Sequence, residues 1–113
     1  MKLQPIIYTT DTAAAVDWYT RVLGAEPGYR SDMWTSFGAG DATLGVHLVE
    51  KLPPEGRVAL SLVATEPLEA VVDRIAAAGI EPAEQIREQP FGRSVLFRDP
   101  DGTPVQINEH AHS

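Results

Sequence analysis

The chain has 113 residues, a mass of 12.3 kDa and a formal net charge of −7. This length and a composition of 43% apolar and 22% charged residues predict one small globular domain. Short apolar runs exclude a transmembrane helix, the acidic balance argues against nucleic acid, and zero cysteines exclude disulfide scaffolds, thiolate metal sites and cysteine nucleophiles.

The first half of the chain predicts a strand, a helix and three further strands. The strand covers residues 3–9, which are rich in Ile and Leu. Asp11 or Thr12 is a natural N-cap for the helix, whose apolar residues recur at helical spacing until Gly24 stops it. Turn residues then separate strands at about 26–31, 33–37 and 42–49.

The second half predicts the same elements. Residues 51–56 form a linker, because their prolines and glycine can continue neither a helix nor a strand. A strand at 57–63 leads to a helix with Thr65 as its cap, Pro67 in its first turn and Gly79 at its end. The remaining predicted elements are strands at about 81–88, 93–98 and 104–108, with a turn at 99–102.

The two halves therefore follow one plan. When the chain is compared with itself at an offset of 55 residues, similar residues coincide in a consistent order, including Thr10 with Thr65, Gly24 with Gly79 and Pro27 with Pro82. One such unit cannot cover the concave side of its own sheet, so two units must pair. We expect one domain over 1–113, with a module at about 1–50, a linker at 51–56, a second module at about 57–109 and a tail at 110–113.

Two segments carry a resemblance to a known family. Residues 18–27, WYTRVLGAEP, and residues 96–109, LFRDPDGTPVQINE, together with the repeated plan, resemble the vicinal oxygen chelate superfamily. This group includes glyoxalase I, the extradiol dioxygenases and the bleomycin-resistance binding proteins. The resemblance implies an α+β fold of two paired βαβββ modules with cupped mixed sheets, the glyoxalase/bleomycin-resistance fold. It also implies a homodimer with a ligand cavity inside each cupped sheet.

The resemblance further implies four positions for a divalent metal, in the first and last strand of each half. These positions match Gln4, His47, either Arg57 or Ala59, and Gln106. Amides are weak ligands, a guanidinium has no lone pair, and the glutamate expected at the last position is replaced by glutamine. We therefore expect no metal and no cofactor, and a chain closest to the metal-free bleomycin-resistance-like branch. The simplest role of His47 is that of a half-buried, hydrogen-bonded residue.

Strand alternation predicts which side chains line the cavity. Aromatic walls would come from Tyr8 and from Trp34 or Phe91, whereas Trp18, Tyr19 and Phe97 belong to core or interface packing. His110 and His112 are expected in a disordered tail. The predicted ligand-binding residues are Gln4, Tyr8, Trp34, His47, Arg57, Gln106 and Asn108.

The lining predicts a protein that binds a small organic molecule without converting it. Such a protein would sequester a hydrophobic or cationic ligand such as an antibiotic. An alternative is a metal-dependent glyoxalase-type or dioxygenase-type enzyme that uses Gln4, His47 and Gln106, or Glu109 through a shifted register. A third hypothesis is a metal-free enzyme in which Arg57 polarises a carbonyl group and His47 acts as general base.

The predicted partners are the small molecule and a second copy of the chain, with no nucleic acid and no membrane. The N-terminal residues have no apolar stretch followed by a cleavage site, so we expect a cytoplasmic location. Pairing of the modules within one chain or across the dimer stays open, although the short linker slightly favours exchange across the dimer.

Overall fold

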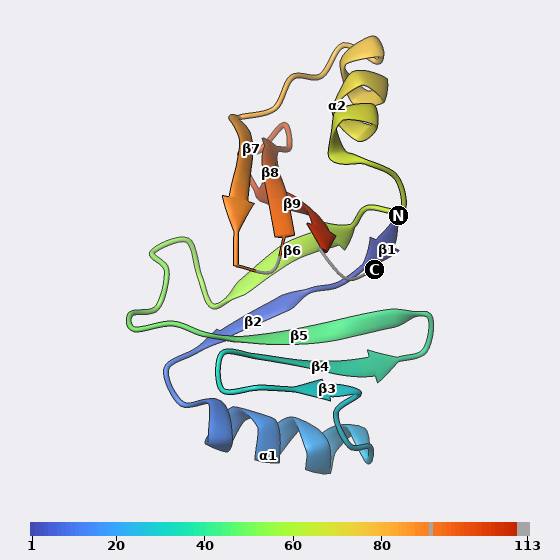
Figure 1. The fold of residues 1–113 in the computed structure, drawn as a ribbon. Coiled ribbons are helices and arrows are strands. Elements are labelled where there is room, and N and C mark those ends of the chain that lie inside the picture. The colour runs from blue at the N-terminus through green and yellow to red at the C-terminus, as the bar shows by residue number, and fades with distance from the viewer. Residues whose placement is uncertain (91, 111–113) are drawn as a thin grey trace. The chain divides into compact units, whose positions relative to one another are not determined.

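The computed structural model describes residues 1–90 and 92–110 (Figure 1). The chain divides into two compact units, Leu3–Ala59 and Leu60–Ser113, the second of which also includes Met1–Lys2. Each unit contains β-strands and one helix, as the predicted α+β class requires. Among the described residues, no helix has the length and apolar character needed to span a membrane.

The unit Leu3–Ala59 has a sheet in the order β3-β4-β5-β2, with the beginning of β6 next to β2. β2 runs parallel to β5, and the other pairings are antiparallel. A predicted single strand at 3–9 is interrupted at Gln4 and Pro5, because proline has no N–H for a strand ladder. The elements are β1 (Lys2–Leu3), β2 (Ile6–Thr9), α1 (Thr12–Leu23), β3 (Tyr29–Arg30), β4 (Trp34–Ala39) and β5 (Ala42–Leu48).

Local sequence determines both ends of α1. Asp11 is its N-cap and accepts a hydrogen bond from the Ala14 N–H at 3.1 Å, as predicted. Gly24 ends the helix with a φ of 66°, a left-handed conformation that glycine adopts without a steric penalty. Between these caps, the buried side chain of Val16 packs in one cluster with Phe37 and Val46, so α1 is held against β4 and β5.

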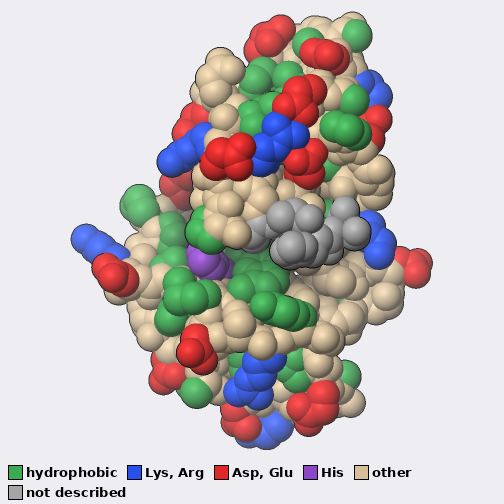
Figure 2. Space-filling view, in the orientation of Figure 1, with side chains coloured by type: hydrophobic (Ala, Val, Ile, Leu, Met, Phe, Trp, Pro, Cys, Tyr) green, Lys and Arg blue, Asp and Glu red, His purple; other side chains and the backbone are tan. Residues whose placement is uncertain are grey.

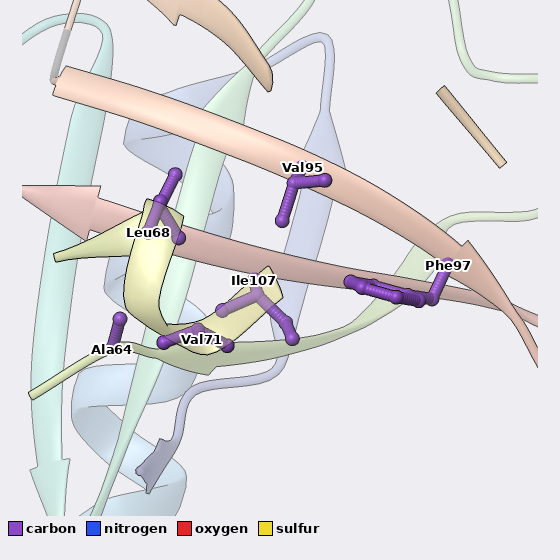
Figure 3. Packing of buried hydrophobic residues seen from close by; sticks show 6 residues of the cluster. All are labelled: Ala64, Leu68, Val71, Val95, Phe97 and Ile107. Carbon is purple, nitrogen blue, oxygen red and sulfur yellow. The ribbon is translucent and has the colours of Figure 1, made fainter. Parts of the chain in front are cut away.

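The unit Leu60–Ser113 has the sheet order β6-β9-β8-β7, in which β6 and β9 are parallel. Its larger core contains six buried side chains, two of them on α2, shown in Figure 3: Ala64, Leu68, Val71, Val95, Phe97 and Ile107. The core position predicted for Phe97 is thus confirmed. The elements are β6 (Val58–Val63), α2 (Leu68–Ala77), β7 (Glu84–Gln89), β8 (Gly92–Arg98) and β9 (Pro104–His110).

The start of α2 differs from the prediction. Pro67, not Thr65, is the N-cap residue, and it offers no side-chain hydrogen bond. Instead, the carboxylate of Glu109 on β9 accepts a hydrogen bond from the Leu68 N–H at 3.0 Å. Gly79, the predicted stop, follows the last helical turn with a φ of 88°. The tertiary structure therefore supplies the cap that the local sequence lacks.

The strand limits also differ at β3, β7 and β9, and β4 ends at Ala39, two residues later than predicted. β3 covers only two residues of the predicted 26–31 strand, whose first half contains Pro27 and Gly28. β7 begins at Glu84, three residues after the predicted start. β9 continues to His110, which pairs with Gly92, so the disorder predicted for His110 is wrong. Phe91 and His112, also singled out in the sequence, lie outside the described residues.

Candidate functional site

One face of the Leu3–Ala59 sheet, opposite to α1, carries a row of aromatic side chains. Tyr8 on β2 is the register partner of His47 on β5, and His47 is the partner of Trp34 on β4. Partners in a ladder project to the same side of a sheet, so the three rings share one face. The His47 ring centroid lies 5.8 Å from that of Tyr8 and 6.2 Å from that of Trp34. We call Tyr8, Trp34 and His47 the aromatic face.

The indole of Trp34 rests against the backbone of Gly45, which lies two residues before His47. A Cβ atom added to Gly45 would lie 2.2 Å from the Trp34 Cη2 atom and less than 3 Å from two further ring atoms. No side chain fits in that space, so glycine is required by the close approach of the ring. The absence of a Cβ atom at Gly45 thus makes room for an indole lying against the sheet.

The other two rings present neutral polar groups. The Nδ1 atom of His47 lies 3.2 Å from the Met33 carbonyl oxygen, which can only accept, so Nδ1–H is the donor and Nε2 remains for a ligand. Burial raises the pKa of the Tyr8 hydroxyl, so this group stays protonated at neutral pH. The aromatic face therefore combines ring surfaces with hydrogen-bonding atoms.

Two further predicted residues belong to the same unit. Gln4 is buried, and its amide Nε2 donates to the hydroxyl of Thr43, near the beginning of β5, at 2.7 Å. Arg57 precedes β6 and lines a groove beside α1, together with Ile7 and Val58. In the register of β6, the residue opposite Ile6 is Ala59. Sequence alternation thus groups Gln4 with Tyr8, Trp34 and His47, and Arg57 lies opposite Tyr8, whose N–H donates to the Arg57 carbonyl oxygen at 2.7 Å.

The last two predicted residues lie in the other unit, on a polar face of its sheet. The buried Asn108 donates from Nδ2 to the Gln106 Oε1 atom at 3.0 Å and to the Ser61 hydroxyl at 3.5 Å. Ser94, which the sequence analysis missed, is the buried register partner of Asn108 and could have been found from its alternation with the core residue Val95. Burial lowers the pKa of His110 at the end of the same strand.

Glu109 projects to the side of β9 opposite to that of Gln106. It therefore cannot replace Gln106 as a metal ligand through a shifted register. Its Oε1 accepts from the Arg93 Nε at 2.8 Å, and its Oε2 accepts from the Leu68 N–H. Arg93 also pairs with Glu69 on α2, and Figure 2 shows acidic and basic side chains side by side over this unit. The Arg93 guanidinium lowers the pKa of Glu109 and lowers that of Glu69 to about 2.

The residues at the implied metal positions do not fit a divalent metal ion. Gln4 and Gln106 are neutral amides, and the Gln106 oxygen already accepts from Asn108. Ala59 has no ligand atom, so His47 alone offers an imidazole, and no carboxylate balances the charge of an ion. Within residues 1–90 and 92–110, no group of three or more His, Asp or Glu side chains could hold a metal ion.

The chain is similar to several solved structures at low sequence identity. A protein from Legionella pneumophila described as an NAD-dependent benzaldehyde dehydrogenase has a TM-score of 0.75 at 20% identity, covering 96% of this chain and 98% of that one. Methylmalonyl-CoA epimerase from Mycobacterium tuberculosis has a TM-score of 0.69 at 18% identity, covering 97% and 88%. A glyoxalase/bleomycin resistance protein/dioxygenase superfamily member from Vibrio splendidus has a TM-score of 0.62 at 18% identity, covering 96% and 97%.

These three likenesses concern the fold, because sequence identity at this level does not carry an activity from one protein to another. The family itself is shown by a match along the sequence. Residues 3–107 match the model of the Glyoxalase/Bleomycin resistance protein/Dioxygenase superfamily, which spans both modules and the strands that carry the aromatic and polar faces. The chain therefore belongs to the Glyoxalase/Bleomycin resistance protein/Dioxygenase superfamily.

Proposed function

We propose that this protein binds a flat hydrophobic or cationic organic molecule on the aromatic face and holds it without changing it chemically. The observation that carries the proposal is the Trp34 indole resting against Gly45, because it provides a stacking surface that exists before a ligand arrives. His47 and Tyr8 beside it add polar atoms that can orient a ligand.

Charge and family support this choice of ligand. The net charge of −7 produces a field that attracts cations, and an indole face attracts a cation through its quadrupole. Bleomycin resistance is one of the functions in the family's description. An antibiotic with a flat cationic part would therefore suit this face, and its sequestration would be the simplest form of resistance.

The proposal can be tested by calorimetric titration with two probes, bleomycin and the planar cation 9-aminoacridine. We expect Trp34→Ala to weaken the binding of at least one of them about thirtyfold, since a desolvated cation–π contact contributes about 2 kcal/mol. Gly45→Ala should act similarly, because the new Cβ atom displaces the indole. Val22→Ala removes an exposed apolar side chain of α1 and serves as the control.

Equal affinities of the wild type and of the Trp34 and Gly45 variants for both probes would overturn the proposal, as would a failure of the wild type to bind either probe. Circular dichroism and urea unfolding of each variant show whether its fold is retained. A folded Gly45→Ala protein with unchanged binding would count directly against a role for the indole.

A metal-dependent lyase or dioxygenase is the alternative to this proposal, and among the implied metal positions His47 alone offers it an imidazole ligand. Its Nδ1 atom faces the Met33 carbonyl, which leaves the Nε2 lone pair as a ligand atom. This hypothesis predicts that EDTA lowers the melting temperature and that nickel, manganese, zinc or iron restores it. One tightly held ion per chain in elemental analysis would support it and count against sequestration without chemistry.

We also propose that the protein forms a homodimer. β3 and β7 are edge strands of their sheets, and exposed apolar side chains such as Val58 and Leu60 remain to be covered. Light scattering at micromolar concentration should give about twice the chain mass of 12.3 kDa, and a value near 12.3 kDa would contradict the proposal. The cytoplasmic location stays a prediction from the sequence.

A further inference from the structure

Arg57 extends the row of side chains that forms the aromatic face. Its carbonyl oxygen accepts a hydrogen bond from the Tyr8 N–H at 2.7 Å, next to the register pair of Ile7 with Val58. Opposite residues of an antiparallel pair project to the same side of a sheet, so the Arg57 side chain leaves the sheet on the side of Tyr8. The row thus has one residue from each of four neighbouring chain segments, in this order: Trp34, His47, Tyr8 and Arg57.

A second row lies beside the first and is apolar. Gly45 pairs with Ile6, and Ile6 pairs with Ala59. Because the Trp34 indole rests against Gly45, a ring surface and small aliphatic groups adjoin the row of polar side chains. Neighbouring strands lie about 4.8 Å apart, so the segment of Arg57 lies about 10 Å from the strand against which the indole rests. A molecule with several fused rings can span that distance.

The charge on this side of the sheet is positive, although the chain as a whole is acidic. With histidine counted as neutral, Arg57 is the one charged residue among the described residues whose register places them on this face. The acidic residues of the Leu3–Ala59 unit lie on α1 or in turns and loops. The residues of the face are Ile6, Tyr8, Tyr29, Trp34, Ser36, Gly38, Thr43, Gly45, His47, Arg57 and Ala59.

Arg57 and Tyr8 both have hydrogen-bond donors to offer to an anion. Within residues 1–90 and 92–110, no ion pair engages the Arg57 guanidinium. Its planar set of donors matches the two oxygens of a carboxylate. Burial raises the pKa of the Tyr8 hydroxyl, so this group keeps its proton at neutral pH and can donate it in a hydrogen bond.

We propose that the molecule bound on the aromatic face carries an acidic group, which Arg57 holds while the rings of the molecule lie on the Trp34 indole. This inference rests on the function proposed above and narrows its ligand class. A hydrophobic ligand would be an aromatic acid, and a cationic ligand would be a zwitterion. The Tyr8 hydroxyl, next to Arg57 in the row, would donate a further hydrogen bond to the acid.

Three acridines with one ring system and different charges test the proposal by calorimetric titration at neutral pH. The probes are acridine-9-carboxylate, the neutral 9-(hydroxymethyl)acridine and the cationic 9-aminoacridine. We expect the carboxylate to bind about tenfold more tightly than the alcohol, which corresponds to about 1.4 kcal/mol for the ion pair. Trp34→Ala should weaken all three probes, because each loses its stacking surface.

Replacing Arg57 separates recognition of the acid from recognition of the rings. Arg57→Gln should abolish the preference for the carboxylate and leave the affinity for the alcohol unchanged. Arg57→Glu should make the carboxylate bind more weakly than the alcohol and should strengthen 9-aminoacridine, because a negative charge then faces the ligand. The matched control is Arg30→Gln. Arg30 is exposed like Arg57 and belongs to the same sheet, but it pairs with Thr35, the partner of the core residue Val46, and so lies on the α1 side.

Equal affinities of the wild type for the carboxylate and the alcohol would overturn the proposal, as would an Arg57→Gln protein that binds the carboxylate as tightly as the wild type does. An equal loss in Arg30→Gln would also overturn it, because the effect would then come from the total charge. In each of these cases the function proposed above stands if Trp34→Ala still weakens the alcohol. Failure of all three probes to bind, or to depend on Trp34, would overturn that function as well.

Discussion

The two units of this chain share one order of strands and helix, but different contacts stabilise them. Asp11 caps α1 from within its own turn, whereas α2 begins at Leu68 and receives its cap from Glu109, a residue 41 positions further along the chain. Arg93 holds Glu109 in place and joins it to Glu69 on the helix. A repeated order of elements therefore does not imply a repeated set of contacts, because each helix terminus can be satisfied by local or by distant groups.

The sheet faces opposite to the helices differ as well. In Leu3–Ala59 this face carries Tyr8, Trp34 and His47, whereas in the other unit it carries a buried hydrogen-bonded set that includes Ser61 and Asn108. Divergence on these faces leaves the cores intact, since alternate residues of a strand serve opposite sides.

The largest expected effect tests the difference between the two cores. Phe37 is fully buried in a cluster with two other buried residues, so Phe37→Ala should cost about 3–5 kcal/mol of unfolding free energy. Phe97 is buried in the six-residue cluster but keeps 7% of its surface exposed, so Phe97→Ala should cost less. Urea unfolding of both variants measures the difference, and a larger loss for Phe97→Ala would contradict this assignment of the cores.

The next effect separates the local cap from the distant one. Glu109→Ala removes both the Leu68 acceptor and a partner of Arg93, and should cost about 2 kcal/mol. Asp11→Ala removes one capping hydrogen bond and should cost about 1 kcal/mol. Amide hydrogen exchange should show faster opening of α2 in the first variant and of α1 in the second. Equal opening of both helices in either variant would contradict the assignment of Asp11 to α1 and of Glu109 to α2.

A third prediction concerns the stability of the fold at low pH. Arg93 lowers the pKa of Glu69 to about 2, and the pKa of Glu109 is lowered in the same direction. A depressed pKa in the folded state contributes stability above the unfolded value, near 4.5, and that contribution is lost as the pH falls toward about 2. Thermal melts should therefore show destabilisation across this range, and a protein with both Glu69→Gln and Glu109→Gln should show a weaker pH dependence.

The smallest effect belongs to an exposed ion pair on α1. Arg21 and Asp17 approach to 2.9 Å, but their side chains are 69% and 68% exposed. Water and salt screen such pairs, so Asp17→Asn should change the unfolding free energy by less than about 0.5 kcal/mol. A loss comparable to that of Glu109→Ala would show that ion pairs on this helix act as strongly as the Arg93 cluster, which we do not expect.

Much of the architecture could be predicted from the sequence, because its signals are local. The order of strands and helices, the Asp11 cap and the Gly24 stop all depend on residues within a few positions of one another. Alternation likewise grouped Tyr8, Trp34 and His47, since successive residues of a strand project to opposite faces. The family followed from the repeated plan and the two segments that carry it.

The remaining features depend on which distant residues come together. The pairing of Ile6 with Ala59, the contact of the Trp34 ring with Gly45 and the Glu109 cap of α2 follow from strand register, and no nearby residue indicates them. The same is true of Arg57, whose place opposite Tyr8 depends on the pairing of β2 with β6. Local hydrogen bonds and periodicity are encoded over a few residues, whereas a binding surface forms only when separate strands and a helix meet.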